Sequence, residues 1–168
     1  MTQIDIDMPN HGPIVVLITG MSGTGKSTTL DELARRGWRA VDTDYDDWQV
    51  AGPDGDPMWD EPKIASLLDS LPANERLALS GTVRNQGRFR HRFAAIVLLT
   101  APLDVMLQRV TARTANPYGS TAADRHAIAR DTEWVLPLLR ESADIELDTG
   151  TQTVSEIADR ISAFIGTR

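Results

Sequence analysis

The sequence predicts an α/β domain in which helices cover both faces of a parallel β-sheet. Short apolar runs rich in β-branched residues alternate along the chain with segments whose apolar residues recur at helical spacing. This alternation of strands and helices is typical of a doubly wound, three-layer domain. The chain has 168 residues, enough for one domain with its own core. We therefore expect a single domain over residues 1–168.

Five segments are expected to form the sheet. The run Ile-Val-Val-Leu-Ile-Thr at residues 14–19 is almost wholly apolar, which is typical of a central parallel strand buried on both faces. The other strands are expected at residues 39–42, 77–80, 95–100 and 145–148.

Five helices are expected from the apolar spacing. They cover residues 27–36, a segment with Pro62 in its first turn, a segment from Leu103 to Val110, residues 121–140 with a bend or break near Pro137, and a last helix that starts at the Thr153/Glu156 capping box. Residues 46–60 are rich in Pro, Gly and Asp, so residues 46–75 are expected to form an acceptor-binding insert. Residues 114–125 contain a turn and are expected to form a lid.

Composition excludes several classes of protein. Seventeen basic and 24 acidic residues give a formal charge of −7, which disfavours a nucleic-acid partner. The chain has no cysteine and only three scattered histidines, which excludes disulfides and thiolate metal sites. We find no signal peptide and no run long enough to span a membrane, so a cytoplasmic protein without a membrane partner is expected. Monomer and homodimer both remain open.

Residues 20–27, Gly-Met-Ser-Gly-Thr-Gly-Lys-Ser, match the phosphate-binding P-loop pattern. A buried strand precedes the motif and an amphipathic helix follows it, which is the context that the pattern requires. Glycines allow backbone N–H groups to surround phosphates, and the lysine reaches the outer ones. The expected nucleotide-binding residues are Gly20, Ser22, Gly23, Thr24, Gly25, Lys26, Ser27 and Thr28.

Two carboxylates follow the second strand, in the sequence Asp42-Thr43-Asp44. Ligands bind at the carboxyl edge of open α/β sheets, and strand alternation sends side chains 42 and 44 the same way. We expect one of them to hold Mg²⁺ together with Ser27 and the other to accept the proton of an attacking hydroxyl. A helix cap or a solvated turn is the alternative.

Arg109 and Arg113 lie one turn apart after the fourth strand. We expect them to clamp the transferring phosphoryl group and neutralise charge in the transition state, with Arg125 assisting from beyond the lid. The alternative is a solvated arginine face on an ordinary helix.

A basic cluster at residues 84–92 leaves the third strand at the same edge. We place Arg84, Asn85 and Gln86 in an acceptor pocket, with Trp48 and Trp59 of the insert as its apolar wall. A partly exposed helix for the basic cluster and core packing for the tryptophans are the alternatives.

With these motifs the chain resembles the small P-loop kinases related to shikimate, gluconate and nucleoside monophosphate kinases, over nearly its whole length. The resemblance rests on the P-loop and on Asp42-Thr43-Asp44. It implies a P-loop fold with strand order 2-3-1-4-5. By this likeness Asp42 serves magnesium and Asp44 the acceptor hydroxyl, and the Arg109 and Arg113 pair is similar to the arginines that flank the family lid.

Departures from the family bear on the acceptor. The sequence has Ser80-Gly81-Thr82 where shikimate kinases show a glycine triplet, and no arginine occurs between Gly52 and Glu75. These differences disfavour shikimate and weaken a nucleotide acceptor. The Phe89-Arg90 pair is loosely similar to gluconate kinases.

The sequence therefore predicts a magnesium-dependent kinase that transfers the γ-phosphoryl group of ATP to a hydroxyl of a small molecule. The expected catalytic residues are Lys26, Asp44, Arg109 and Arg113, the metal ligands Ser27 and Asp42, and the acceptor-binding residues Asp44, Trp48, Arg84, Asn85 and Gln86. The alternatives are a nucleoside monophosphate kinase and a nucleotide-binding regulatory ATPase module without a small-molecule acceptor.

Overall fold

The computed structural model describes residues 11–114 and 116–168. The first ten residues of the expected domain and residue 115 of the expected lid lie outside the described residues.

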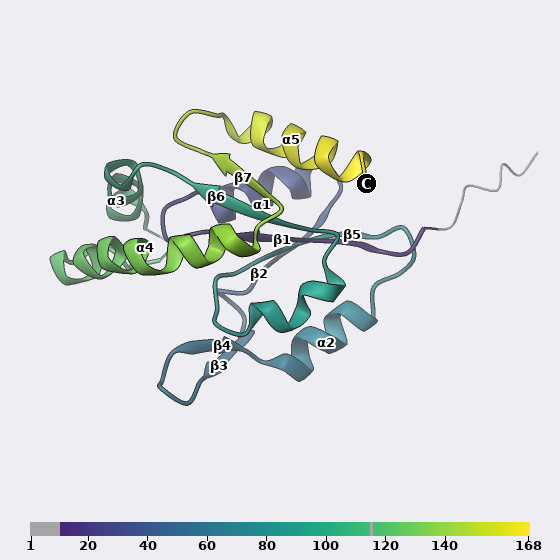
Figure 1. Ribbon diagram of the computed structural model, residues 1–168, viewed down its shortest axis with the longest axis horizontal. Helices are drawn as coiled ribbons and strands as arrows, with labels where there is room; N and C mark the ends of the chain where they lie inside the picture. Colours follow the sequence, from purple (N-terminus) through teal and green to yellow (C-terminus); the bar gives the residue numbers. More distant parts are fainter. Residues whose placement is uncertain (1–10, 115) are drawn as a thin grey trace, which may run out of the picture.

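A five-stranded parallel sheet forms the centre of the protein (Figure 1). Its strands are β1 (Ile14–Thr19), β2 (Arg39–Asp42), β5 (Arg76–Ser80), β6 (Ala95–Thr100) and β7 (Ile145–Asp148). They are arranged in the order β2-β5-β1-β6-β7, and every neighbouring pair is parallel. This is the predicted order 2-3-1-4-5, because the labels β3 and β4 belong to a separate hairpin. The apolar run of β1 thus lies at the centre, where both faces are covered.

Two helices pack on one face of the sheet and two on the other (Figure 1). On the first face α1 (Lys26–Arg35) and α5 (Val154–Gly166) bury a cluster that includes Leu33 and Ile161. On the second face α2 (Glu61–Asp69) and the 3₁₀ helix η1 (Gln86–Arg92) bury a cluster around Trp59. The sheet therefore lies between two packed layers of helices.

The remaining helices, α3 (Leu103–Ala112) and α4 (Ala122–Ser142), pack together through Met106, Val110 and Ile128. The expected break at Pro137 is absent, since α4 continues through it to Ser142. Proline lacks a backbone donor and crowds the carbonyl group four residues earlier, which weakens a helix without having to end it, and Leu139 beyond Pro137 is buried.

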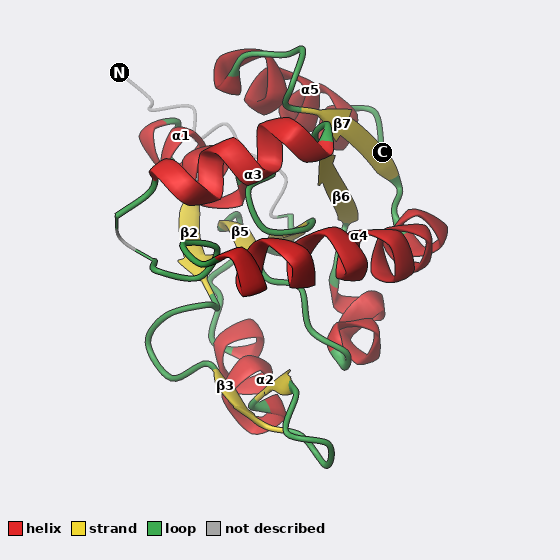
Figure 2. Cartoon of the chain, turned by 90° about the vertical axis from the view of Figure 1, so that its left-hand side faces the viewer, coloured by secondary structure: helices red, strands yellow, loops and turns green. Residues whose placement is uncertain are grey.

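The insert is more ordered than its composition predicts. Residues expected to form a loop contain an antiparallel hairpin, β3 (Gln49–Ala51) paired with β4 (Pro57–Trp59). The helix that follows begins where predicted, with the Asp60 side chain capping the N–H of Lys63 and a proline in its first turn. In Figure 2 the hairpin and α2 lie at the opposite end of the molecule from α5.

Trp59 joins the hairpin to the core. Its side chain is 1% exposed and packs edge-on against Phe89 of η1 and against Phe93, the residue that follows η1. Its indole Nε1 donates to Thr43 Oγ1 at 2.8 Å. Trp59 is therefore a core residue, which is the packing alternative considered for it, and not the wall of an acceptor pocket.

We expect Trp59→Ala to lower the free energy of unfolding by about 3–5 kcal/mol, because it empties a packed core site and removes a buried hydrogen bond. Trp134, which is 71% exposed on α4, gives a matched control, and Trp134→Ala should stay within about 0.5 kcal/mol of the parent protein. Urea unfolding followed by circular dichroism measures both. Equal losses in the two variants would contradict this placement of Trp59.

Candidate active site

The P-loop connects β1 to α1 at the carboxyl edge of the sheet. Gly23 and Gly25 adopt φ values of 83° and 89°, in the left-handed region that favours glycine. A Cβ atom on Gly23 would lie 2.5 Å from the backbone oxygen of Met106 in α3. Glycine is thus required here by conformation and by close packing, and the loop amides and the start of α1 together form an anion site.

Lys26 reaches back across this loop. Its Nζ donates to the carbonyl oxygens of Gly20 at 2.7 Å and Met21 at 3.1 Å. Burial lowers the pKa of Lys26 below its usual 10.5, and Arg113 lowers it further, while the carboxylates of Asp44 and Asp42 act in the opposite direction. An anion such as a phosphate would therefore compensate a buried positive charge.

Thr82 fixes the first residue of the P-loop. Its hydroxyl donates to the carbonyl oxygen of Gly20 at 2.7 Å and accepts from the N–H of the same residue at 3.2 Å. Thr19, the last residue of β1, lies 3.1 Å from the same hydroxyl. Thr82 is thus a structural anchor of the P-loop.

The two carboxylates after β2 are positioned by a buried threonine between them. Thr43 donates from its N–H and its Oγ1 to the carbonyl oxygen of Ser80, at 3.0 and 2.7 Å. β2 ends at Asp42, so the expected strand alternation does not extend to Asp44. The direction of Asp44 is set instead by a turn in which its N–H donates to Asp42 Oδ1 at 3.1 Å.

Ser27 and Asp42 fit the requirements of a magnesium site. Ser27 Oγ donates to Asp42 Oδ2 at 2.7 Å. Adjacent oxygens around Mg²⁺ are about 3.0 Å apart for metal–oxygen bonds of about 2.1 Å, so little movement is needed for both to face one ion. Among residues 11–114 and 116–168 no group of three or more His, Asp or Glu side chains forms a metal cluster. Mg²⁺ usually combines one or two carboxylates with phosphate oxygens and water.

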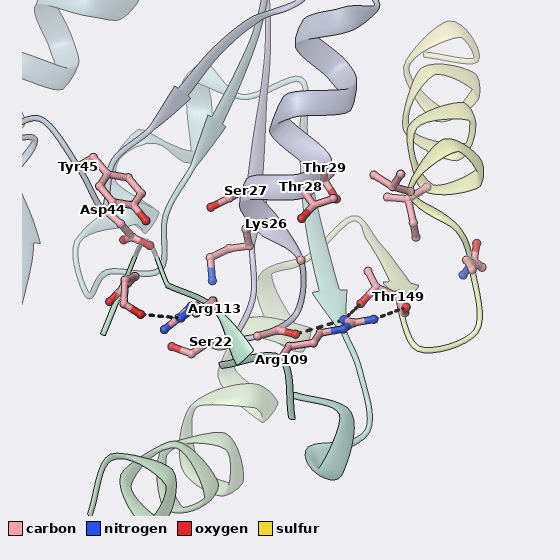
Figure 3. Close-up of a pocket in the computed structure, with 16 residues that line it drawn as sticks. Ser22, Lys26, Ser27, Thr28, Thr29, Asp44, Tyr45, Arg109, Arg113 and Thr149 are labelled. Atoms are coloured by element: carbon pink, nitrogen blue, oxygen red, sulfur yellow. Dashed lines mark hydrogen bonds between the residues drawn. The ribbon is translucent and has the colours of Figure 1, made fainter. Parts of the chain in front are cut away.

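A cavity of about 500 Å³ lies over the P-loop (Figure 3). It brings together P-loop residues with Asp44, Arg109, Arg113 and Asn116 of the expected lid. Asp44 Oδ1 accepts a hydrogen bond from Gln49 Nε2 at 3.2 Å. The P-loop residues that line the cavity are Ser22, Gly23, Gly25, Lys26, Ser27 and Thr28. Thr24 is buried behind them and donates to the Met21 carbonyl oxygen.

Sequence reasoning missed one side of this cavity. This side is lined by two residues of the loop after β7, Thr149 and Gln152, and by two residues of α5, Val154 and Ile157. The cavity is also lined by Thr29 and Tyr45, which were not predicted either. A signal was available, because the loop after the fifth predicted strand must leave the sheet at the same edge as the P-loop.

Arg109 and Arg113 both line the cavity, but their contacts differ. Arg109 donates to Thr149 Oγ1 at 2.8 Å, to the Thr149 carbonyl at 2.8 Å and to the Gly23 carbonyl at 3.2 Å. Arg113 donates to the carbonyl oxygens of Asn116 and Tyr118, and its charge acts on Lys26. Arg109 thus connects the P-loop to the loop after β7, and Arg113 connects the phosphate site to the lid segment.

Arg125 is placed further away. It donates to the carbonyl oxygens of Gly119 and Ser120, within the turn that precedes α4, and it is not among the residues that line the cavity.

Apart from Asp44, the residues predicted to bind the acceptor do not line this cavity. Arg84 binds Asp54 and Asp56 of the hairpin, both at 3.0 Å. Asn85 is buried and exchanges hydrogen bonds with the backbone of Trp59, at 2.9 and 3.1 Å.

Gln86 and Trp48 also have other contacts. Gln86 is buried, and its side chain accepts from the N–H of Val83 at 3.0 Å. Trp48 packs beside Lys63, whose Nζ lies 4.7 Å from the ring centroid. As the structure stands, these two residues and Asn85 support the insert and η1, so their acceptor roles remain predictions.

The other arginines of the basic cluster are paired as well. Arg88 contacts Glu61 at 2.9 Å, Arg90 contacts Asp144 at 2.9 Å, and Arg92 contacts Asp69 at 2.8 Å. The cluster is therefore largely neutralised by carboxylates of the same chain.

Residues 16–131 match a family model described as an AAA domain. The match spans more than half of the chain and includes the P-loop and both carboxylates. The chain belongs to this AAA-domain family. Within the described residues, the AAA-domain protein has no helix long and apolar enough to cross a membrane.

Curated relatives of this AAA-domain protein are named nucleotide-binding proteins. One from Arthrobacter sp. is 32% identical over 159 residues, covering 88% of this chain and 48% of the relative. Another from Solibacter usitatus is 29% identical over 174 residues, covering 96% and 49%. The chain spans about half the length of the curated relatives it matches.

Solved structures with the same fold include small kinases. Shikimate kinase from Acinetobacter baumannii, in complex with shikimate, gives a TM-score of 0.64 at 20% identity and covers 92% of this chain and 93% of its own. A gluconokinase from Sinorhizobium meliloti gives 0.53 at 19% identity, with 94% of each chain covered. The AAA-domain protein therefore has a small P-loop kinase fold of the shikimate and gluconate kinase group, as the sequence predicted.

We expect Gly23→Ala to weaken ATP binding by at least about tenfold, because the new methyl group meets the Met106 carbonyl and the backbone leaves its left-handed conformation. Gly87→Ala is the matched control, since no atom lies within 4 Å of its Cβ position. Isothermal titration calorimetry measures both affinities. Unchanged affinity in Gly23→Ala would contradict the described loop conformation.

We expect Lys26→Met to raise the free energy of unfolding of the nucleotide-free protein at neutral pH, because it removes a partly buried positive charge whose pKa is lowered by desolvation. The pKa of Lys26 is lowered in the folded state, so the folded protein binds fewer protons than the unfolded chain near that pKa. Stability of the parent protein should therefore rise as the pH increases through the folded pKa towards 10.5, and the advantage of the variant should shrink.

Urea unfolding at neutral and alkaline pH tests this expectation, with Arg130→Met as the control on a cation whose side chain is 68% exposed. A Lys26→Met variant less stable than the parent at every pH would show that the ammonium group contributes more through its carbonyl contacts than burial costs.

Proposed function

We propose that the protein is a kinase that transfers the γ-phosphoryl group of ATP to a hydroxyl group of a small molecule. The observation that carries the proposal is that Asp44, Lys26 and Arg113 line one cavity. A carboxylate beside a phosphate site would repel the nucleotide unless it served the acceptor or the metal. If a phosphoryl group is transferred to a bound hydroxyl, the Asp44 carboxylate has a role as the acceptor of the hydroxyl proton.

In this reaction Asp44 accepts the proton of the acceptor hydroxyl while the hydroxyl oxygen bonds to the γ-phosphorus. The bond from that phosphorus to the β–γ bridging oxygen breaks in line, and ADP leaves. Gln49, which donates to Asp44 Oδ1, orients the carboxylate so that its other oxygen faces the acceptor. Because the transition state adds little covalent chemistry for the protein to perform, positioning and charge stabilisation dominate.

The positive groups of the cavity stabilise the charge on the phosphoryl oxygens. Lys26 exchanges its contacts with the P-loop carbonyls for the β- and γ-phosphates, and Arg113 approaches from the lid side. Arg109 fixes the position of the P-loop relative to the loop after β7, and it lines the cavity. Ser27 and Asp42 would hold Mg²⁺, which supplies charge neutralisation at the phosphates when bound.

A phosphorylated acceptor is less suited to this site than a neutral or cationic one. Nucleoside monophosphate kinases need arginines that are free to clamp the acceptor phosphate. Here Arg84 and Arg88, the two candidates nearest β5, already bind hairpin and α2 carboxylates. This pairing favours a hydroxylated acceptor without a phosphate over the nucleoside monophosphate alternative.

A regulatory nucleotide-binding module without an acceptor is the second candidate. It is supported by the names of the curated relatives, which state nucleotide binding only. ATP consumption with Mg²⁺, measured alone and against monophosphates, sugar acids, shikimate and amino alcohols, separates the two candidates. Stimulation by one class supports the kinase, and slow hydrolysis unchanged by every class supports the module.

We expect Asp44→Asn to lower kcat for phosphoryl transfer by about 10²–10⁴-fold, because the amide cannot accept the acceptor proton. The Kd for ATP should change by less than about threefold, since the P-loop is untouched. Asp47→Asn, an exposed carboxylate of the same segment outside the cavity, is the matched control. Full transfer activity in Asp44→Asn would remove this residue from the mechanism.

A further inference from the structure

Helix α4 carries the two most exposed large apolar side chains among the residues that the structure describes. Trp134 is 71% exposed and Leu138 is 64% exposed, whereas the other exposed large apolar residues lie between 40% and 48%. Single exposed apolar residues are common on protein surfaces, but contiguous apolar patches mark interaction sites. We call Trp134 and Leu138, with the exposed Pro137 between them, the α4 patch.

Helical spacing places the α4 patch on a side of the helix that the core does not use. Trp134 and Leu138 are one turn apart, so their side chains are neighbours on the helix surface. The buried residues of α4 are Ile128 and Leu139, and Ile128 packs against α3, which lies beside α4 in Figure 2. At 3.6 residues per turn, Trp134 lies about 120–140° around the helix from both of them. Packing within the single chain therefore leaves the patch uncovered.

Opposite charges lie at the two ends of the α4 patch. Arg130 precedes Trp134 by four residues, and Glu141 follows Leu138 by three. Arg130 and Glu141 are eleven residues apart, close to three whole turns, so they lie on the same side of the helix. Arg130 is 68% exposed, and its ion pair with the adjacent Asp131 is long, at 3.6 Å. Along α4 the face thus presents a cation, two large apolar groups and an anion.

This order is self-complementary in an antiparallel pair of helices. A two-fold axis midway between Trp134 and Leu138 places Trp134 against the partner's Leu138, and the symmetric contact forms on the other side of the axis. The same axis brings Arg130 beside the partner's Glu141, again twice. A parallel pair would instead bring each charge against its own copy, which is repulsive. Charge complementarity therefore favours the antiparallel arrangement of two identical chains.

We propose that a second copy of this chain binds along α4, so that the protein forms an antiparallel homodimer through the α4 patch. The sequence left monomer and homodimer open. The pair has an apolar centre and a charged rim, which is the usual anatomy of a protein interface, and tryptophan is typical of the residues that dominate binding energy. One helix pair buries less than the about 1,600 Å² of a standard interface, so a reversible dimer at micromolar concentration is expected.

The α4 patch contributes to assembly and not to the folding of the single chain. Association stabilises the folded state only when the protein concentration exceeds the Kd of the dimer. Well below that concentration, Trp134→Ala and Arg130→Met leave the free energy of unfolding nearly unchanged, as expected of exposed positions. The two contributions can therefore be measured separately in the same variants.

Sedimentation equilibrium of the nucleotide-free protein, from about 1 µM to about 500 µM, measures the Kd of the dimer. Trp134→Ala and Leu138→Ala should each weaken the dimer by at least about tenfold, because both remove apolar contact from its centre. Leu103→Ala, which removes an exposed leucine from the neighbouring helix α3, is the matched control and should stay within about twofold of the parent. A parent protein that stays monomeric throughout overturns the proposal and leaves the patch to a different partner. A dimer that neither α4 variant weakens overturns it as well.

Charge reversals test the antiparallel arrangement. Arg130→Glu and Glu141→Arg each place like charges together, and each should weaken the dimer by about fivefold or more. The variant with both reversals restores opposite charges across the pair and should recover most of the parent affinity. All these positions are exposed, so unchanged far-ultraviolet circular dichroism should accompany the losses. A double variant no better than the single ones overturns the arrangement.

This inference and the proposed function stand or fall separately. The sedimentation experiment uses no nucleotide and no acceptor, and none of the substituted residues lines the cavity over the P-loop. A monomeric protein that transfers phosphoryl groups overturns only the dimer, and a dimer without transfer activity overturns only the kinase.

Discussion

The two hydrogen bonds from Thr43 to the carbonyl oxygen of Ser80 hold the candidate site together. They fix the end of β2 against the end of β5, and so determine where Asp42 and Asp44 leave the sheet. Trp59 donates to the same Thr43 hydroxyl and joins the hairpin of the insert to this point. A Cβ atom on Gly81 would lie 2.5 Å from Thr43 Oγ1, so the neighbouring glycine is part of the same constraint. One buried threonine, Thr43, therefore connects the two carboxylates, the hairpin of the insert and the end of β5.

The sheet and the P-loop could be predicted because each depends on local pattern. β1 is apolar from Ile14 to Ile18, and the P-loop motif lies between a strand and a helix, so neither needs information from distant residues. Resemblance to a family supplied the strand order. The hairpin could not be found in the same way, because its strands have three residues each and owe their pairing to contacts with Asn85 and the core.

Side-chain partners were the least predictable part of the site. Arg84 and Asn85 leave β5 at the correct edge, yet their hairpin partners Asp54 and Trp59 lie 30 and 26 positions away along the chain. Gln86 binds the nearby Val83 but also Thr19 of β1, which is 67 positions away. A sequence shows the charge of an arginine but not the carboxylate that neutralises it. The loop at Thr149 was missed for the related reason that its residues carry no motif and become part of the cavity only through the fold.

The acidic insert gives the molecule an uneven electric field. Residues 46–75 contain eight carboxylates and a single lysine, a balance equal to the formal net charge of −7 of the whole chain. Arg84, Arg88 and Arg92 form ion pairs with carboxylates of the insert, so eight carboxylates there lie beside four positive charges, which leaves a net charge of −4 in this part of the molecule. The insert therefore repels negatively charged molecules and attracts positively charged ones before they reach its surface. Salt screens this interaction, whose range falls to about 10 Å at an ionic strength of 0.1 M.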